Sequence, residues 1–313
     1  MQLLTDVLDL VRQHYIFPSV AAEVVTAIEA RAAAGEFDDL GDDDLAARVT
    51  ECFHAVSGDK HLRLLVRSPD HRAAVTPEEA EAAWLEAQRL AGHHIAAVQR
   101  LDGNVGYIDL RGVAAPGTAG AAVTAAMELV AHTGALVFDL RRNKGGDPDG
   151  VQLWLSYLFP DSDTHLNDIY DGRTTRTRQF WTLAYVPGRR YLDRPVYVLT
   201  SAFTFSAGEE FAYNLKALGR ATLVGEVTRG GAHPTDRFPV SPTLEVAVPN
   251  ARSVNPVTGT NWEGTGVVPD IAVAAGDALT VAHRKALEHI LTTSTSHAVL
   301  TEAREALVFS SNS

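Results

Sequence analysis

The chain has 313 residues, and its apolar fraction of 46% is enough for a sizeable core in one large α/β domain with a smaller appendage. The formal net charge of −12 argues against nucleic acid or an anionic membrane as partner, because both need a basic face that neutralises phosphates. The single cysteine, Cys52, excludes an intramolecular disulfide and a thiolate metal cluster, and its place on a predicted helix indicates a core residue.

The first fifteen residues do not form an uninterrupted apolar stretch. They contain Asp6, Asp9, Arg12 and His14, so we expect no signal peptide. No later segment approaches the eighteen or so apolar residues of a membrane span. The sequence therefore predicts a cytoplasmic protein without a membrane span.

Helical periodicity dominates the first part of the chain. Apolar residues recur at helical spacing in three stretches, over residues 3–15, 19–34 and 43–56. Pro18 separates the first two stretches, and the turn at 35–39 separates the last two. We predict a small helical N-terminal module over residues 1–60.

Beyond it, strands and helices alternate. A strand over 61–67 and a helix over 77–91 come first, and Asp102-Gly103 joins two strands within 94–111 as a hairpin. The pattern then predicts a helix over 118–133, a strand over 135–140, a helix over 147–158, a strand over 195–200, a helix over 206–218 and a strand over 221–224. Such alternation indicates a parallel or mixed sheet covered on both faces.

A polar insertion over 167–191 interrupts this alternation. Asp171-Gly172 is typical of a hairpin tip, and five arginines form a basic cluster: Arg173, Arg176, Arg178, Arg189 and Arg190. Two readings stay open, a solvated β-hairpin and a lip that binds an acidic or carboxylate-bearing substrate. Further strands run through Pro239 and over 244–248, and C-terminal helices are predicted within 278–308, over 278–291 and around 302–307.

Ser206 stands where the apolar strand 196–200 gives way to an amphipathic helix. The first amides of a helix have no partner inside it and favour negative charge beside them, which suits the oxyanion of acyl chemistry. Ser206 and Glu209 also match a capping box, in which Ser206 caps the helix and has a purely structural role. This segment alone does not decide between the structural and the catalytic role.

A serine hydroxyl needs a neighbouring base before it becomes a good nucleophile. His61 follows a tight turn at the start of a strand, where side chains face a cleft. The turn from Asp139 to Gly146 follows another buried strand and ends in two glycines, which let backbone amides approach a ligand closely. Neither a GxxxxGK[ST] loop nor a GxGxxG fingerprint is present, which argues against a phosphate cradle.

Four segments in this order and spacing resemble the tail-specific protease family, the serine peptidases of family S41. They are the turn 139–146, the elbow 204–209, the loop 225–231 and the segment 264–270. The resemblance covers about residues 61–291. The helical front is similar to the N-terminal module of the branch that includes interphotoreceptor retinoid-binding protein modules.

The resemblance implies an α/β fold with a ClpP/crotonase-like spiral core of βαβ units over residues 61–313. It also implies that Ser206 is the nucleophile and that the amides of Ala207 and Gly146 form the oxyanion hole. The carboxy-terminal processing members use a lysine in a glycine-lysine pair, where this chain has Gly230-Gly231. The likeness is instead to the tricorn-like branch, which implies His61 as base and Glu263 as the residue that orients it.

Two further departures bear on substrate recognition. Only about 30 residues separate His61 from the hairpin region 94–111 that contains Asp102, and they indicate chiefly one helix, so we expect no PDZ domain. Lys60 stands where tricorn-like enzymes have a serine. His233 follows Gly231 near the expected cleft and is interpreted as a wall or structural residue rather than a second base.

Together these features predict a serine peptidase or acyl hydrolase that acts through an acyl-enzyme on Ser206. The expected partner is a peptide or another acyl substrate, no metal or organic cofactor is expected, and a homo-oligomer is possible. Two alternatives stay open: a module that binds a retinoid-like or fatty-acid-like ligand, and a biosynthetic acyl hydrolase or cyclase with the same triad.

Overall fold

The structure is a computed structural model that describes residues 2–67 and 76–310. The chain folds into two compact units. The first contains Met1–Glu86, Asp168–Arg178 and Gly231–Val254, and the second contains Ala87–Asn167, Gln179–Gly230 and Asn255–Ser313. The division into domains over 1–60 and 61–313 stays a prediction.

Three helices open the first unit and confirm the predicted helical N-terminal region. They are α1 (Gln2–His14), α2 (Pro18–Ala33) and α3 (Asp42–Ser57). Pro18 lies in the first turn of α2, where its missing N–H costs nothing. Three aspartates in the first turn of α3 complement the helix dipole. Gly58, with a φ of 69°, ends α3 in the left-handed conformation that favours glycine.

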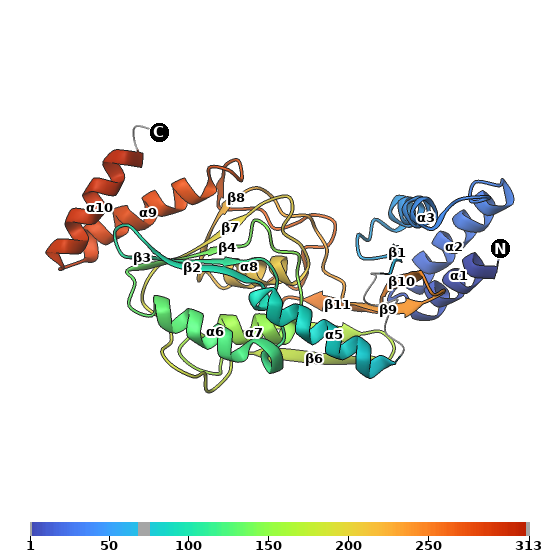
Figure 1. The fold of residues 1–313 in the computed structure, drawn as a ribbon, viewed down its shortest axis with the longest axis horizontal. Coiled ribbons are helices and arrows are strands. Elements are labelled where there is room, and N and C mark those ends of the chain that lie inside the picture. The colour runs from blue at the N-terminus through green and yellow to red at the C-terminus, as the bar shows by residue number, and fades with distance from the viewer. Residues whose placement is uncertain (1, 68–75, 311–313) are drawn as a thin grey trace. The chain divides into compact units, whose positions relative to one another are not determined.

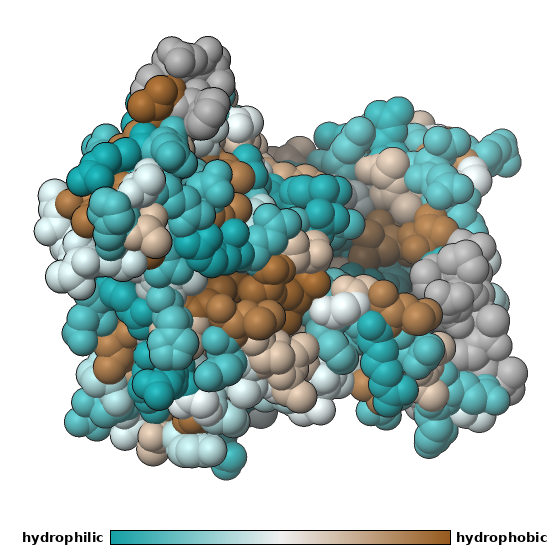
Figure 2. Space-filling model, turned by 60° about the vertical axis from the view of Figure 1, so that its left-hand side comes forward, coloured by the Kyte–Doolittle hydropathy of each residue, from teal (hydrophilic) through white to brown (hydrophobic). Residues whose placement is uncertain are grey.

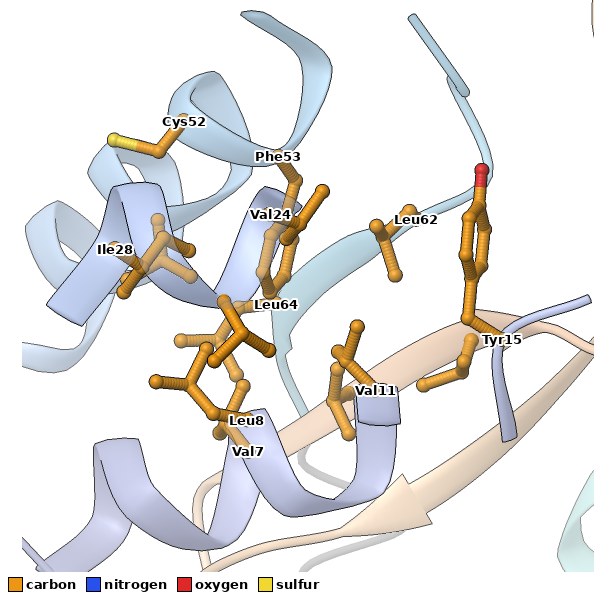
Figure 3. Packing of buried hydrophobic residues seen from close by; sticks show 14 of the residues in the cluster. Val7, Leu8, Val11, Tyr15, Val24, Ile28, Cys52, Phe53, Leu62 and Leu64 are labelled. Carbon is orange, nitrogen blue, oxygen red and sulfur yellow. The ribbon is translucent and has the colours of Figure 1, made fainter. Parts of the chain in front are cut away.

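These helices pack on a small antiparallel sheet. Its strand order is β1 (Arg63–Val66), β10 (Leu244–Pro249) and β9 (Thr235–Pro239). Figure 3 shows side chains of α1, α2 and α3 pointing toward Leu62 and Leu64, and Phe53 is fully buried among them. Cys52 is 1% exposed, which confirms its predicted place in the core.

Two strands lie in the region of the predicted polar insertion over 167–191. Strands β5 (His165–Asp171) and β6 (Arg176–Trp181) are neighbours in a three-stranded sheet, and β11 (Ala251–Val254) pairs with β5 in antiparallel fashion. The sequence did not predict β11. Arg173 at the tip forms ion pairs with Asp171 and Asp236, so this arginine is engaged within its own unit.

A six-stranded sheet forms the centre of the second unit. Its strand order is β12 (Ile271–Ala272), β8 (Thr222–Gly225), β7 (Val196–Thr200), β4 (Ala135–Asp139), β3 (Val105–Leu110) and β2 (Ile95–Leu101). Only the β2–β3 pair is antiparallel, which confirms the hairpin at Asp102-Gly103, and the other pairs are parallel. The predicted parallel or mixed sheet is therefore confirmed.

Helices cover both faces of this sheet (Figure 1). Val137 belongs to the core that β4 shares with α9 (Ala278–Thr293) and α10 (His297–Ser310). The next residue, Phe138, contacts Trp154 of α7 (Pro148–Ser156) and Phe211 of α8 (Ala207–Ala217) in edge-to-face geometry. Successive side chains of a strand point to opposite faces, so the uninterrupted apolar run of β4 reflects burial on both sides.

The remaining helices are α5 (Pro77–Leu90), the short 3₁₀ helix η1 (Gly92–His94) and α6 (Pro116–Val130). No helix within residues 2–67 and 76–310 combines the length and the apolar character needed to cross a bilayer. Hydrophilic residues cover much of the face shown in Figure 2, with apolar patches between them. This mixed surface agrees with a net charge of −12 and an apolar fraction of 46%.

Candidate active site

Ser206 lies at a sharp elbow between β7 and α8. Its backbone has a φ of 54° and a ψ of −124°, a conformation that residues with a side chain rarely adopt. Backbone strain of this kind costs about 1–3 kcal/mol and persists only where the surroundings enforce it. The amides of Glu209 and Glu210 donate to the carbonyl of Ser206 at 2.8 and 2.9 Å, so the helix begins immediately after the elbow.

The glycine turn after β4 packs against this elbow. Gly145 and Gly146 have φ values of 98° and 146°, in the region that favours glycine. A Cβ atom on Gly145 would stand 2.6 Å from the Cβ of Ser206, and one on Gly146 would overlap the carbonyl of Val113. Both glycines are therefore required by close approach of the backbone as well as by conformation.

Asn143 joins the two turns. Its backbone carbonyl accepts a hydrogen bond from the amide of Phe205 at 3.1 Å. Its side chain is fully buried, accepts from the amide of Gly145 at 2.8 Å and donates to the carbonyl of Leu110 at 2.9 Å. One asparagine thus fixes the glycine turn relative to Ser206, because all its contacts lie within a rigid buried network.

Two backbone amides are available beside this junction. The amides of Gly146 and Ala207 donate to no acceptor among the residues that the structure describes. Gly146 is exposed and Ala207 begins α8, where the helix dipole adds positive potential. Such amides are suited to bind an oxyanion.

The Glu209 carboxylate connects the elbow to the loop 225–231 and, through Thr228, to the segment 264–270. This carboxylate, fully buried, accepts hydrogen bonds from the amide of Ser206 at 2.8 Å, the hydroxyl of Thr228 at 2.6 Å and the amide of Gly230 at 2.6 Å. Thr228 in turn accepts from the amide of Val267 at 2.7 Å. The predicted capping contact of Glu209 with the Ser206 amide is present. The same carboxylate joins the elbow to the loop 225–231, and Thr228 of that loop reaches the segment 264–270, so three of the four segments that carry the family resemblance are connected.

Glu263 lies half-buried in the same unit. It follows the buried Trp262, and its amide donates to the side chain of Asn261 at 2.9 Å. The next amide, that of Gly264, donates to the carbonyl of Gly230, the residue held by Glu209. The structure thus connects the segment of Glu263 with the elbow through the Gly230 loop.

Glu210, the neighbour of Glu209, is a buried carboxyl of a different kind. It is 4% exposed, and burial raises its pKa to about 8, with the charges of Asp147 and Asp149 acting in the same direction. The amides of Asn167 and Asn214 oppose that increase without cancelling it. Glu210 is therefore largely protonated at pH 7, and it lies four residues after Ser206 in α8.

His61 belongs to the first unit, where α3 turns into β1. Its amide donates to Oδ1 of Asp59 at 2.9 Å, and Oδ2 of Asp59 lies 2.7 Å from Nδ1 of His233. The hydroxyl of Tyr15 donates to the same Oδ2 at 3.1 Å. Asp59 and His233 are almost completely buried, which agrees with the structural role predicted for His233.

The structure brings together Ser206, Ala207 and the Gly146 turn within the second unit, which also contains Glu263. His61 belongs to the first unit, so its union with them in a triad is a proposal. Sequence reasoning assigned no role to Asn143 or Asp59, although both lie in segments that it singled out. A polar residue two positions before a glycine turn or a histidine is the signal that was available.

The arginines of the predicted basic cluster do not share one role. Arg190 donates to the backbone carbonyls of Phe159, Leu183 and Ala184, at 2.9, 2.7 and 3.1 Å. A fourth carbonyl, that of Ser156, accepts from the same guanidinium. Arg190 therefore organises a loop of the second unit, and this finding leaves it fewer donors for a substrate.

An α/β sheet with a serine at a strained strand-to-helix turn, beside unpaired backbone amides, is the arrangement in which serine hydrolases hold their nucleophile. The chain belongs to peptidase family S41. The profile of that family, described as Peptidase family S41, matches residues 104–273, and a second profile, the N-terminal domain of Peptidase_S41 in eukaryotic IRBP, matches residues 1–94.

A carboxyl-terminal-processing protease from Synechocystis sp. (strain ATCC 27184 / PCC 6803 / Kazusa) is 32% identical over 176 residues. The match covers 54% of this chain and 38% of that protease. A lipoprotein from Streptococcus agalactiae resembles the structure with a TM-score of 0.59 and 16% identity, over 91% of this chain and 95% of that one. The tricorn protease resembles the structure with a TM-score of 0.54 and 15% identity, over 96% of this chain and 36% of that one. At these identities the two structures show the fold alone.

Proposed function

We propose that this chain is a serine peptidase in which Ser206 attacks a peptide carbonyl and forms an acyl-enzyme. The observation that carries the proposal is the strained elbow of Ser206 packed against the Gly145-Gly146 turn. Strain maintained beside two unpaired amides is typical of a functional site, since a helix cap alone needs neither.

In the proposed mechanism His61 accepts the proton of Ser206 and returns it to the leaving amine. Glu263 orients His61 and stabilises the imidazolium that forms. The amides of Gly146 and Ala207 stabilise the tetrahedral oxyanion. The similarity to a carboxyl-terminal-processing protease supports a peptide as the substrate.

Intact-mass labelling with a fluorophosphonate probe tests this proposal. We expect one adduct on the wild type, none on Ser206→Ala, and labelling slowed about 10²–10⁴-fold by His61→Ala, the range that a positioned base contributes. Glu263→Gln should slow labelling less, because it leaves the base in place. Circular dichroism of each variant controls for folding.

Peptide-library cleavage then separates the peptidase from a biosynthetic hydrolase with the same triad. A labelled enzyme that cleaves no peptide would contradict the peptidase and favour a non-peptide acyl substrate. A folded wild type without an adduct between pH 6 and 9, a range of about three units around the titration of a typical histidine, would contradict acyl chemistry altogether. It would favour the hydrophobic-ligand module, which titration with a fluorescent fatty acid tests.

Two accompanying proposals have their own tests. A homo-oligomer is checked by sedimentation velocity, where a single species at 33.6 kDa would contradict it. A cytoplasmic location is checked by fractionation of the native host, where recovery outside the cytoplasm would contradict it.

A further inference from the structure

The carboxylate of Asp59, in the turn between α3 and β1, contacts three other residues of the first unit. It is 2% exposed, and its two oxygens contact different partners. Oδ1 accepts the amide of His61 at 2.9 Å, whereas Oδ2 faces Nδ1 of His233 at 2.7 Å and accepts the hydroxyl of Tyr15 at 3.1 Å. Asp59 thus joins the segment just before β1 to Tyr15, which directly follows α1, and to the segment before β9.

The turn itself leaves little freedom at Asp59. Gly58 caps α3 with a left-handed φ of 69°, and the amide of Asp59 donates to Oγ of Ser57 at 3.1 Å. The amide of Leu62 closes the turn on the carbonyl of Asp59 at 3.3 Å. The carboxylate is therefore held from its own backbone as well as from its side-chain partners, so that any movement of it would move the backbone of His61.

The Asp59 carboxylate also interacts electrostatically with His61. Burial by itself raises the pKa of Asp59, but the hydrogen bond and charge of His233, the amide of His61 and the charge of His61 together lower it below its usual value. The carboxylate is ionised at neutral pH, and one of its oxygens lies within 4.8 Å of a ring nitrogen of His61, so a positive charge on that ring is attracted to it. Within the described part of the first unit, the titratable groups that contact Asp59 include Tyr15, His61 and His233.

We propose that Asp59 is a positioning residue for His61, which it holds by the backbone amide and whose imidazolium it stabilises by charge, while His233 holds Asp59 in place. The inference rests on the proposed function, in which His61 is the base. In this inference, the buried His233 holds the Asp59 carboxylate in place. Asp59 is then a second carboxylate, besides Glu263, that interacts with the proposed base His61.

Substitutions separate the two effects of Asp59. Asp59→Asn keeps an acceptor for the His61 amide but removes the charge, whereas Asp59→Ala removes both. His233→Asn keeps a neutral donor near the position of Nδ1, whereas His233→Ala removes it. Thr50→Val is the matched control, because Thr50 makes two hydrogen bonds to the backbone of Leu64 in the same unit and carries no charge.

The readout is the rate of fluorophosphonate labelling as a function of pH. For Asp59→Asn we expect the midpoint of the acidic limb to fall by about one unit, because an imidazolium without its carboxylate loses its proton more readily. The maximal rate should fall about tenfold, and further in Asp59→Ala. His233→Asn should retain most of the rate that His233→Ala loses, and Thr50→Val should label like the wild type.

A second measurement does not depend on activity. The imidazole of His61 is titrated by NMR in the wild type and in Asp59→Asn, with its signal assigned by its loss in His61→Ala. The inference predicts a lower midpoint in Asp59→Asn. Unchanged midpoints in both measurements, or a rate that falls equally at every pH, would overturn it and leave Asp59 as a structural residue.

The two failures are distinguishable. A wild type that labels at Ser206 while Asp59→Asn keeps the wild-type profile contradicts the positioning role and leaves the proposed function intact. A wild type without any adduct contradicts the proposed function and with it the catalytic meaning of Asp59, even if the NMR titration shows the charge coupling.

Discussion

Gly145 shows how closely the chemistry at one residue depends on its neighbour. Its missing side chain lets the glycine turn touch the Cβ of Ser206, and its φ of 98° suits no other residue. The contact is a property of the folded chain, since 61 residues of sequence separate the two positions. A substitution at Gly145 should therefore affect Ser206, the proposed nucleophile, before it affects the fold.

We predict that Gly145→Ala abolishes labelling of Ser206 while the protein stays folded. The added methyl would stand 2.6 Å from the Cβ of Ser206 and force the elbow to shift. Intact-mass labelling and thermal unfolding measure the two effects. Gly120→Ala in α6 is the control, because a Cβ there meets nothing within 4 Å; it should label normally and be stabilised by about 0.5–1 kcal/mol. Normal labelling of Gly145→Ala would contradict the proposed site.

The raised pKa of Glu210 makes the free energy of unfolding depend on pH. An acid whose pKa is raised to about 8 in the folded state binds its proton more tightly there than in the unfolded chain, where the model value is 4.5. Its contribution to stability is fully present below the unfolded pKa and is lost as pH rises through the folded pKa.

We therefore expect Glu210→Gln to flatten the loss of stability between about pH 4.5 and 8. Glutamine mimics the protonated acid, so the variant and the wild type should agree near pH 4.5 and differ by a few kcal/mol at pH 9, the order that a shift of this size implies. Urea unfolding at each pH measures the difference. Parallel curves for the two proteins would show that Glu210 is already ionised in the folded state.

At the scale of elements, β4 shows what periodicity can and cannot predict. Its five residues are all buried, and an apolar run of that length is compatible with a buried strand or a piece of buried helix. The alternation of strands and helices favoured a strand over 135–140, and the structure confirms it as Ala135–Asp139. By contrast, the two-residue strand β12 carries no periodicity and could not be predicted.

Phe138 provides the test of packing for this element. It is fully buried between α7 and α8, in contact with Trp154 and Phe211, so Phe138→Ala should cost about 3–5 kcal/mol in the free energy of unfolding. Leu129→Ala in α6 is the matched control, because Leu129 is 73% exposed, and it should change stability by less than about 0.5 kcal/mol. Equal effects in denaturant unfolding would contradict the described burial.

At the scale of the whole molecule, each unit has its own hydrophobic core. Phe53 belongs to the core of the first unit and Leu287 to that of the second, and both are fully buried. The first core joins α1–α3 to strands that come about 180 residues later, so neither unit is a continuous piece of the chain. Separate cores allow separate local unfolding.

We expect Phe53→Ala and Leu287→Ala to act on different parts of the protein. Phe53→Ala should accelerate amide hydrogen exchange chiefly in α1–α3, and Leu287→Ala chiefly in the six-stranded sheet and α9, because each removes contacts within one core. Hydrogen exchange detected by mass spectrometry resolves the two. Exchange that rises throughout the chain in both variants would show that the cores unfold as one.

The sequence predicted most of the elements because their signals are local: apolar periodicity, Gly58 and Pro18 at helix ends, and Asp102-Gly103 at a hairpin. It also predicted the elbow of Ser206, since a strand followed by a helix start can be recognised within ten residues. It could not predict β11 or the hydrogen bonds that Arg190 donates to backbone carbonyls, because both depend on the tertiary structure. The triad of Ser206, His61 and Glu263 stays a prediction.

The sequence by itself determined the family, the order of most strands and helices, and the turn chemistry that a serine nucleophile needs, because spacing and residue type carry this information. Only the tertiary structure decided that Gly145 packs against Ser206, that Glu209 joins the elbow to the loop 225–231, and that Asp59 contacts both His61 and His233. Contacts between residues separated by up to 174 positions arise from packing and burial, which no local pattern of residues encodes.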